Sequence, residues 1–418
     1  MKTGPYFYNP MAKFLLTFNL IFLTACSFEN STVQVGIVHS LTGTMAVSEE
    51  PVARATLMAI EEINSRGGVL GKQIEPLLYD GGSDDEQFFQ ITKKLLLESN
   101  VDTVFGCWTS SCRKTIKPLF EQHDKLLVYP VQYEGLERSS NILYTGATIA
   151  QQVFPALSWG LKTFGSRVLF IGSDYIYPHA ANQQARQYIN LLGGQVIAEQ
   201  YYPLGDENLS NVVSMVEQAE VDFIFSTMNG SSNRSLFNQL SHNKNKIPII
   251  ATSISGRELE AESLDFPVYV TNSYFASLPS ASNIEFVKKF RAYTQGEYNV
   301  SAAVEAAYVG VYLWAKAVEY AQSFNAGKLF SVLPAMSLNG PSDEIIVDLN
   351  GHHLWRKYYL ARLNNNGEFT IEVSSNALLP PNPYPMTQSE SMWDQYIESL
   401  FMQWQGQWSA PVNKAIDS

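Results

Sequence analysis

The sequence predicts an α/β protein built from two doubly wound parallel-sheet lobes. The chain has 418 residues, which is too long for one ordinary hydrophobic core and suits two domains. From Val33 onward, short apolar runs alternate with amphipathic helical segments, which is the pattern of β-α-β units. This alternation restarts near Gln151, so two similar units follow one another along the chain.

The first unit predicts four strands separated by three helices. The expected strands are residues 33–38, 74–80, 101–106 and 126–130, and the expected helices are residues 52–64, 83–99 and 112–123. The pair Gly67-Gly68 follows the first helix and suits its C-terminal turn.

The second unit begins with an expected helix at residues 151–164. Strands are expected at residues 167–172, 195–202, 222–227 and 247–252, with helices at 179–192, 209–219 and 231–240. Two further helices, 283–293 and 300–322, are expected to return to the first lobe, since the second of them is long and apolar on one face. Strands at 344–349, 355–363 and 369–373 follow, with a turn at Asn365-Asn366-Gly367.

The N-terminus predicts a signal peptide. Lys13 precedes an apolar run at residues 14–23, which is shorter than the roughly 20 residues that a membrane span needs. The stretch Leu23-Thr24-Ala25-Cys26 resembles a bacterial lipoprotein box, which implies removal of residues 1–25 and lipidation of Cys26. Met11 is an alternative start site.

The other two cysteines, Cys107 and Cys112, are expected to be free, buried thiols. They lie five residues apart, where a strand is expected to end and a helix to begin. Helical geometry would separate their Cα atoms by more than about 7 Å, which is too far for an easy disulfide.

The composition argues against several classes of function. With 28 basic and 40 acidic residues the formal net charge is −12, so no basic excess is present to neutralise nucleic-acid phosphates. The sequence has no dinucleotide-binding glycine motif, no Walker loop and no nucleophile elbow. Beyond the adjacent pair His352-His353, whose side chains would point to opposite faces of a strand, the six histidines form no metal-ligand cluster. Binding, without cofactor, metal or catalysis, is the expected activity.

Two loops at predicted strand ends in the first lobe offer groups for a small ligand. Residues 106–111 combine glycine, hydroxyls and a helix start, and thus supply backbone N–H donors; the alternative is plain N-capping by Ser110 or Ser111. Residues 129–135 supply aromatic walls and an amide; the alternative is a loop whose rings only cover the core.

Two more loops come from the second lobe. In residues 173–178, Tyr175 and Tyr177 are expected to share a direction and Ile176 to point the opposite way, while Asp174 forms the turn. Residues 252–255 offer hydroxyls, which could instead cap a helix that begins near Glu258.

Residues 374–418 form a Pro- and Trp-rich extension that is expected to pack on the surface. The prolines at 380–385 exclude a helix or a central strand there. Trp393, Trp404 and Trp408 then require apolar cover.

The residues VGIVHSLTGTMA at 35–46 resemble the opening of type I periplasmic binding proteins of the branched-chain amino-acid and amide group. The loops at 106–110, 129–135 and 172–178 resemble the urea and short-chain amide branch, and Val131-Gln132 favours its urea-binding members. The resemblance implies two α/β lobes joined by a three-segment hinge. It places residues 33–147 and 274–340 in the first lobe, and 148–273 and 341–373 in the second.

The resemblance also implies a ligand site and a function. Its expected ligand-binding residues are Trp108, Ser110, Tyr129, Val131, Tyr175, Tyr177 and Ser253, with Ser255 as the alternative to Ser253. The implied function is that of a lipid-anchored, extracytoplasmic receptor that captures urea and delivers it to an ABC transporter permease. The alternatives are a short-chain amide such as acetamide or formamide, a branched-chain amino acid, and a role as an amide-sensing receptor.

Overall fold

The computed structural model describes residues 1, 3–4, 31–218, 220–241, 243–254, 264–364 and 368–411. The signal segment, the lipidation candidate Cys26, Ser255 and the turn at 365–367 lie outside these ranges. Within these ranges, none of the helices combines the length and the hydropathy needed to cross a bilayer.

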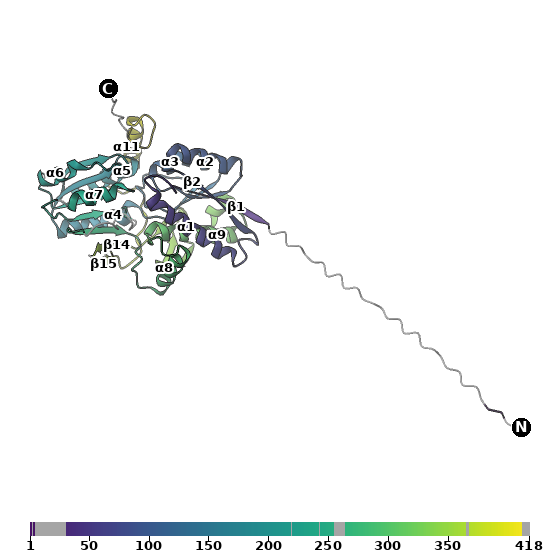
Figure 1. The fold of residues 1–418 in the computed structure, drawn as a ribbon. Helices are drawn as coiled ribbons and strands as arrows, with labels where there is room; N and C mark the ends of the chain where they lie inside the picture. Colours follow the sequence, from purple (N-terminus) through teal and green to yellow (C-terminus); the bar gives the residue numbers. More distant parts are fainter. Residues whose placement is uncertain are drawn as a thin grey trace.

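The first lobe is a five-stranded parallel sheet with the order β2-β1-β3-β4-β5. Its strands are β1 Thr32–His39, β2 Gln73–Asp80, β3 Thr103–Gly106, β4 Leu126–Tyr129 and β5 Ile142–Tyr144. Helices α1 Ala46–Asn64, α2 Asp85–Leu97 and α3 Ser110–His123 follow the first three strands. The loops at the carboxyl ends of these strands open toward the second lobe (Figure 1).

The second lobe is a seven-stranded sheet with the order β15-β14-β10-β9-β8-β6-β7. Its parallel part contains β6 Arg167–Ser173, β7 Gln195–Tyr202, β8 Phe223–Thr227, β9 Ile249–Ala251 and β10 Val268–Asn272. Antiparallel strands β14 Tyr359–Leu363 and β15 Phe369–Ser374 complete one edge. Its helices are α4 Ile149–Thr163, α5 Ile176–Leu191, α6 Ser210–Gln218 and α7 Ser232–Ser241. The predicted fold class, two parallel-sheet α/β lobes, is confirmed.

Three helices after β10 return to the first lobe, as the apolar face of the second one predicted. They are α8 Ala281–Tyr293, α9 Ala302–Ala321 and α10 Ala326–Val332. Helix α9 packs along α1 (Figure 1), and its Trp314 Nε1 donates a 3.0 Å hydrogen bond to Thr103 Oγ1 of β3. The amphipathic pattern of this helix thus predicted its return to the first lobe, and the structure adds that its partner there is α1.

A small antiparallel sheet corrects the expected lobe boundary. It contains β11 Ser337–Gly340, β12 Asp343–Val347 and β13 Leu354–Trp355. The side chains of Ile345, Val347 and Leu354 are buried in the core of the first lobe, whereas the resemblance assigned residues from 341 onward to the second. The chain enters the second lobe after β13, because β14 is the first strand that joins the larger sheet.

The C-terminal extension contains one helix that the sequence analysis did not anticipate, α11 Glu390–Gln403. Trp393 and Trp404 are buried in the hydrophobic cluster that includes residues of α5, so the apolar cover these rings require comes from the second lobe.

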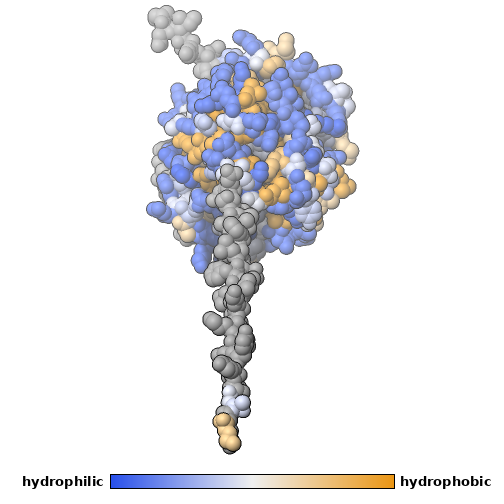
Figure 2. Space-filling view, turned by 90° about the vertical axis from the view of Figure 1, so that its right-hand side faces the viewer, coloured by the Kyte–Doolittle hydropathy of each residue, from blue (hydrophilic) through white to orange (hydrophobic). Residues whose placement is uncertain are grey.

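The face of the molecule that Figure 2 shows is largely hydrophilic, with hydrophobic residues in scattered small groups.

Candidate functional site

The four loops singled out in the sequence meet between the lobes, which are in contact. Three side-chain hydrogen bonds join the lobes there: Thr44 Oγ1 to Ser231 Oγ at 2.7 Å, Trp108 Nε1 to Asn229 Oδ1 at 3.2 Å, and Gln132 Nε2 to Ser253 Oγ at 2.8 Å. The structure is therefore a closed arrangement, in which residues of both lobes share one buried interface.

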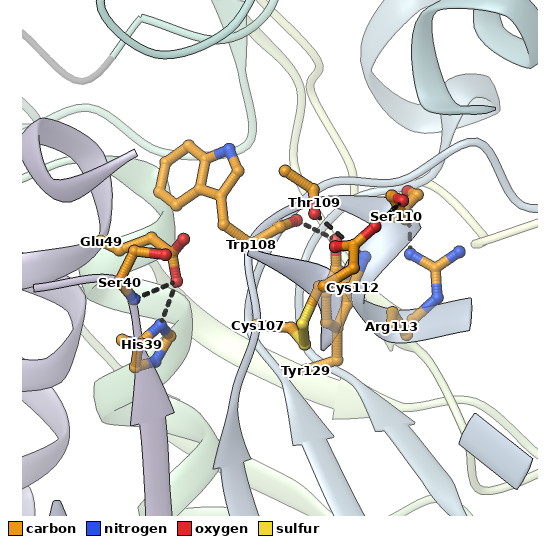
Figure 3. Close-up of a disulfide and its surroundings, with 12 residues drawn as sticks. His39, Ser40, Glu49, Cys107, Trp108, Thr109, Ser110, Cys112, Arg113 and Tyr129 are labelled. Carbon is orange, nitrogen blue, oxygen red and sulfur yellow. Dashed lines mark hydrogen bonds and ion pairs between the residues drawn. A yellow bond between two sulfur atoms is a disulfide. The ribbon is translucent and has the colours of Figure 1, made fainter. Parts of the chain in front are cut away.

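The loop between β3 and α3 is closed by a disulfide, which the sequence analysis did not expect. Cys107 and Cys112 are bonded, with their Cα atoms 5.9 Å apart (Figure 3). The helical spacing assumed for this pair was wrong, because α3 begins only at Ser110 and Cys107 adopts a left-handed backbone with φ of 64°. Both cysteines are buried, so the bond lies inside the loop that carries Trp108 and Ser110.

Thr109, rather than Ser110 or Ser111, caps the start of α3. Its hydroxyl accepts a 3.0 Å hydrogen bond from the backbone N–H of Cys112. The alternative interpretation, in which Ser110 or Ser111 caps the helix, is thus wrong, and their hydroxyls bind other partners. Ser110 points toward Arg113 (Figure 3) and Glu134. The Ser111 hydroxyl donates to Asp85 and accepts from Ser409 of the C-terminal extension.

A buried quartet of charges lies beneath Ser110. Arg113 forms ion pairs with Glu134 at 2.8 Å and with Glu137 at 2.9 Å, and Lys114 pairs with Glu137 at 2.9 Å. The Ser110 hydroxyl donates to Glu134 Oε2 at 2.5 Å and accepts from Arg113 at 2.9 Å. Two cations face two carboxylates, so the quartet is formally neutral.

The charges of this quartet set the ionisation of Glu137. Burial by itself raises the pKa of this carboxyl, but the positive charges of Arg113 and Lys114 outweigh it and hold the pKa far below its usual range. Glu137 therefore remains a carboxylate and pairs with both cations of α3.

Tyrosine rings cover the quartet. The Arg113 guanidinium lies 4.8 Å from the ring centre of Tyr129 and 4.7 Å from that of Tyr133, within cation–π range. The Tyr129 hydroxyl donates to the carbonyl oxygen of Trp108 at 2.5 Å, and Val131 is buried beside these rings. The rings therefore do what the alternative interpretation expected, since they cover a core, and they also border the interlobe interface.

The second lobe contributes Tyr175 and Tyr177. Their ring centres are 6.3 Å apart, and each residue is only 2% exposed. The expected strand-like alternation is wrong, because α5 begins at Ile176 and Tyr177 lies in its first turn. Asp174 forms an ion pair with His179 at 2.7 Å.

The two tyrosine hydroxyls differ in their partners. Tyr177 donates to Thr252 Oγ1 at 3.3 Å. For the Tyr175 hydroxyl, the described part of the chain offers no hydrogen-bond partner. Burial raises the pKa of Tyr175, with further contributions from nearby Tyr129 and Glu134, so this phenol stays protonated and faces the first lobe's loops.

A cavity of about 10 Å³ lies in the interface, and its lining includes Trp108, Gln132 and Ser253. This volume is close to that of one water-sized probe. It shares lining residues with a 380 Å³ pocket on the side of α9, among them Asn272 and Ser301. The cavity in the interface therefore adjoins this larger pocket.

The family model of the periplasmic binding protein domain matches residues 33–390 of this chain. This chain belongs to the periplasmic binding protein family. The family's location implies an extracytoplasmic protein, and the relatives described next are binding proteins rather than enzymes.

Several relatives of this periplasmic binding protein are described by their ligands. The Leu/Ile/Val-binding protein homolog 7 of Brucella abortus is 22% identical over 356 residues, covering 78% of this chain and 87% of that relative. The Leu/Ile/Val-binding protein BraC3 of Rhizobium johnstonii is 23% identical over 210 residues, covering 49% of this chain. The match spans only about half the length of two of these relatives: it covers 56% of BraC3 and 54% of a Leu/Ile/Val/Thr/Ala-binding protein of Pseudomonas aeruginosa.

Solved structures establish the same fold. A solute-binding protein of an ABC transporter from Rhodopseudomonas palustris BisB5, in complex with 3,4-dihydroxybenzoic acid, has a TM-score of 0.76 at 20% identity, covering 84% of this chain and 99% of that one. LivJ of Streptococcus pneumoniae in complex with isoleucine has a TM-score of 0.72 at 19% identity, covering 84% and 100%.

The structure of this periplasmic binding protein groups its candidate residues into two sets. Ser110, Tyr129, Tyr175 and Tyr177 lie around the charge quartet, whereas Trp108 and Ser253 line the small cavity. Arg113 and Glu137 were not among the residues predicted from the sequence. A signal for Arg113 was present, because Arg113 and Lys114 lie three and four residues after Ser110 on the same helix face.

Proposed function

We propose that this periplasmic binding protein captures a small neutral amide, with urea as the first candidate, and delivers it to an ABC transporter permease. The observation that carries the proposal is the Tyr175 hydroxyl, which belongs to a residue that is only 2% exposed, has no hydrogen-bond partner in the described part of the chain and faces a charge-neutral cluster. This hydroxyl is not among the fully buried atoms that lack a partner, so it remains accessible and can donate a hydrogen bond to a small ligand.

The available hydrogen-bond capacity suits urea, which has one carbonyl acceptor and four N–H donors. Tyr175 is the free donor for the carbonyl oxygen. The O–H of Ser110 is already donated to Glu134, so this residue contributes a remaining lone pair, and not the donor that we expected from the sequence. Tyr177 likewise donates to Thr252 and keeps its lone pairs for a ligand N–H.

The charge balance favours a neutral ligand over an amino acid. An ammonium group requires an uncompensated anion, but Glu134 and Glu137 are matched by Arg113 and Lys114. Isoleucine and dihydroxybenzoic acid, which are bound in two of the solved relatives, both carry a carboxylate, and in this chain that carboxylate would find the nearby cations already paired. Acetamide and formamide remain alternatives, because they present the same carbonyl and N–H groups.

Two further parts of the proposal concern the location and the partner. Lipidation at Cys26 would hold the receptor at the membrane surface, close to the permease that would receive the solute. An amide-sensing receptor is the alternative role, and co-purification of a permease rather than of a regulator distinguishes them.

Tyr175→Phe is expected to weaken urea binding at least about tenfold, equivalent to about 1.4 kcal/mol, with little change in stability. Titration calorimetry of the mature protein with urea measures the affinity. The exposed Tyr320→Phe serves as the matched control and should bind as the wild type does. Saturable heat of binding with leucine or a hydroxybenzoate, together with no heat of binding with urea or acetamide, would contradict the neutral-amide proposal.

A further inference from the structure

The end of the C-terminal extension, residues 404–411, lies across both lobes beside the candidate site. On the second lobe it pairs with the backbone of the tyrosine loop: Ile176 N donates to Trp408 O at 2.9 Å, and Ala410 N donates to Asp174 O at 3.1 Å. These bonds flank an antiparallel bridge between Tyr175 and Ser409. The extension is thus hydrogen-bonded to the residues on both sides of Tyr175.

The same segment contacts the first lobe at the start of α3. The hydroxyls of Ser409 and Ser111 lie 3.0 Å apart, and Lys114 Nζ lies 5.1 Å from the Trp408 ring centre. Ser111 and Lys114 are the immediate neighbours of Ser110 and Arg113. Two consecutive residues of the extension therefore connect the ligand loops of the two lobes.

The attachment is stronger on the second lobe than on the first. On the second lobe, Trp404 is 3% exposed and meets His179 edge-on at 5.0 Å, and Tyr396 donates to the His179 carbonyl oxygen at 3.2 Å. At the first lobe, residues 404–411 make one hydroxyl contact and one cation–π contact. Opening of the lobes would break these first-lobe contacts and leave the segment on the second lobe.

We propose that residues 404–411 form a latch that stabilises the closed state and slows release of the solute. The latch adds contacts that exist only when the lobes are together, so it shifts the population toward closure. Its link to release rests on the proposed function, because it assumes that closure encloses a solute. Trp408 and Ser409 are positioning residues in this proposal, since they act through Ser111, Lys114 and the backbone on either side of Tyr175.

The test uses the full-length protein with the double substitution Trp408→Ala/Ser409→Ala. The exposed neighbour Gln407→Ala is the matched control. Spin labels at exposed positions of the two lobes, introduced by Leu97→Cys and Leu191→Cys, report the interlobe distance without ligand. Stopped-flow fluorescence reports urea dissociation.

The double variant is expected to populate wider interlobe distances without ligand and to release urea about tenfold faster, while Gln407→Ala matches the wild type. Unchanged distances together with an unchanged release rate would overturn the latch, even where urea binding confirms the proposed function. Absence of urea binding in every variant would refute urea as the ligand, and the distance measurement would still decide the latch. The single Ser409→Ala variant repeats the test if the double variant folds poorly.

Discussion

Arg113→Ala is expected to lower the free energy of unfolding by about 3–5 kcal/mol, because it leaves two buried carboxylates without their main partner. Arg113 is fully buried and pairs with Glu134 and Glu137 at 2.8 and 2.9 Å. Its guanidinium also lies over the rings of Tyr129 and Tyr133, so alanine would leave a void beneath the aromatic wall. Lys114 would be the remaining cation, 2.9 Å from Glu137 and 3.6 Å from Glu134, so one positive charge would be left for two buried carboxylates.

The measurement is equilibrium unfolding in guanidinium chloride, since urea is the proposed ligand and would stabilise the folded state that it is meant to unfold. Lys117→Ala on the same helix is the matched control. Its ion pair with Glu121 at 3.6 Å is partly exposed, so its loss is expected to cost about 1 kcal/mol at most. Equal effects of the two substitutions would show that the quartet is not a buried, mutually dependent set.

The parts of the fold that follow from hydrophobic periodicity were predictable. Strands such as β1 and β8 are apolar runs with polar loops at their ends, and α9 has one apolar face. The prediction failed where tertiary contacts decide the structure. Residues 355–363 were expected to form one strand, but the chain leaves β13 of the first lobe and joins the second-lobe sheet at β14, with a break between Trp355 and Tyr359.

The sequence predicted loops that meet between the lobes, but it did not predict their hydrogen bonding. Tyr175 and Ser110 are visible in the sequence as polar groups at strand ends, where open α/β sheets bind ligands. That the Ser110 hydroxyl is already donated to Glu134 depends on a contact 24 residues away, which no local pattern reports. The sequence therefore indicates which loops meet between the lobes, while the long-range contacts decide which hydrogen bonds each side chain can still form.

The C-terminal extension also has one feature that the sequence predicted and one that only the tertiary structure reveals. Its three tryptophans indicated a need for apolar cover, and Trp393 and Trp404 obtain it on α5. The third, Trp408, lies over Lys114 of the first lobe, because the chain turns back after α11 and runs beside the tyrosine loop. Composition predicted that these rings are packed, but only the path of the chain reveals that one of them spans the lobes.

Replacing both Cys107 and Cys112 with serine is expected to weaken urea binding about tenfold and to lower the free energy of unfolding by about 2 kcal/mol. The disulfide closes the short loop that carries Trp108 and Ser110, and thereby holds Cys107 in its left-handed conformation. Without the bond, this loop would lose conformational freedom on ligand binding, and that entropy cost would appear in the affinity.

Calorimetry with urea and unfolding in guanidinium chloride measure the two effects of the double serine variant. Thr109→Val is the matched control: it removes the N-cap of α3 but keeps the disulfide, so it is expected to cost about 1 kcal/mol of stability with a smaller loss of affinity. A larger loss of affinity in Thr109→Val than in the serine variant would assign the order of this loop to its helix cap. Mass spectrometry after alkylation of the denatured wild type tests the bond itself, since two alkylated cysteines at these positions would contradict the disulfide and restore the free thiols that spacing alone predicted.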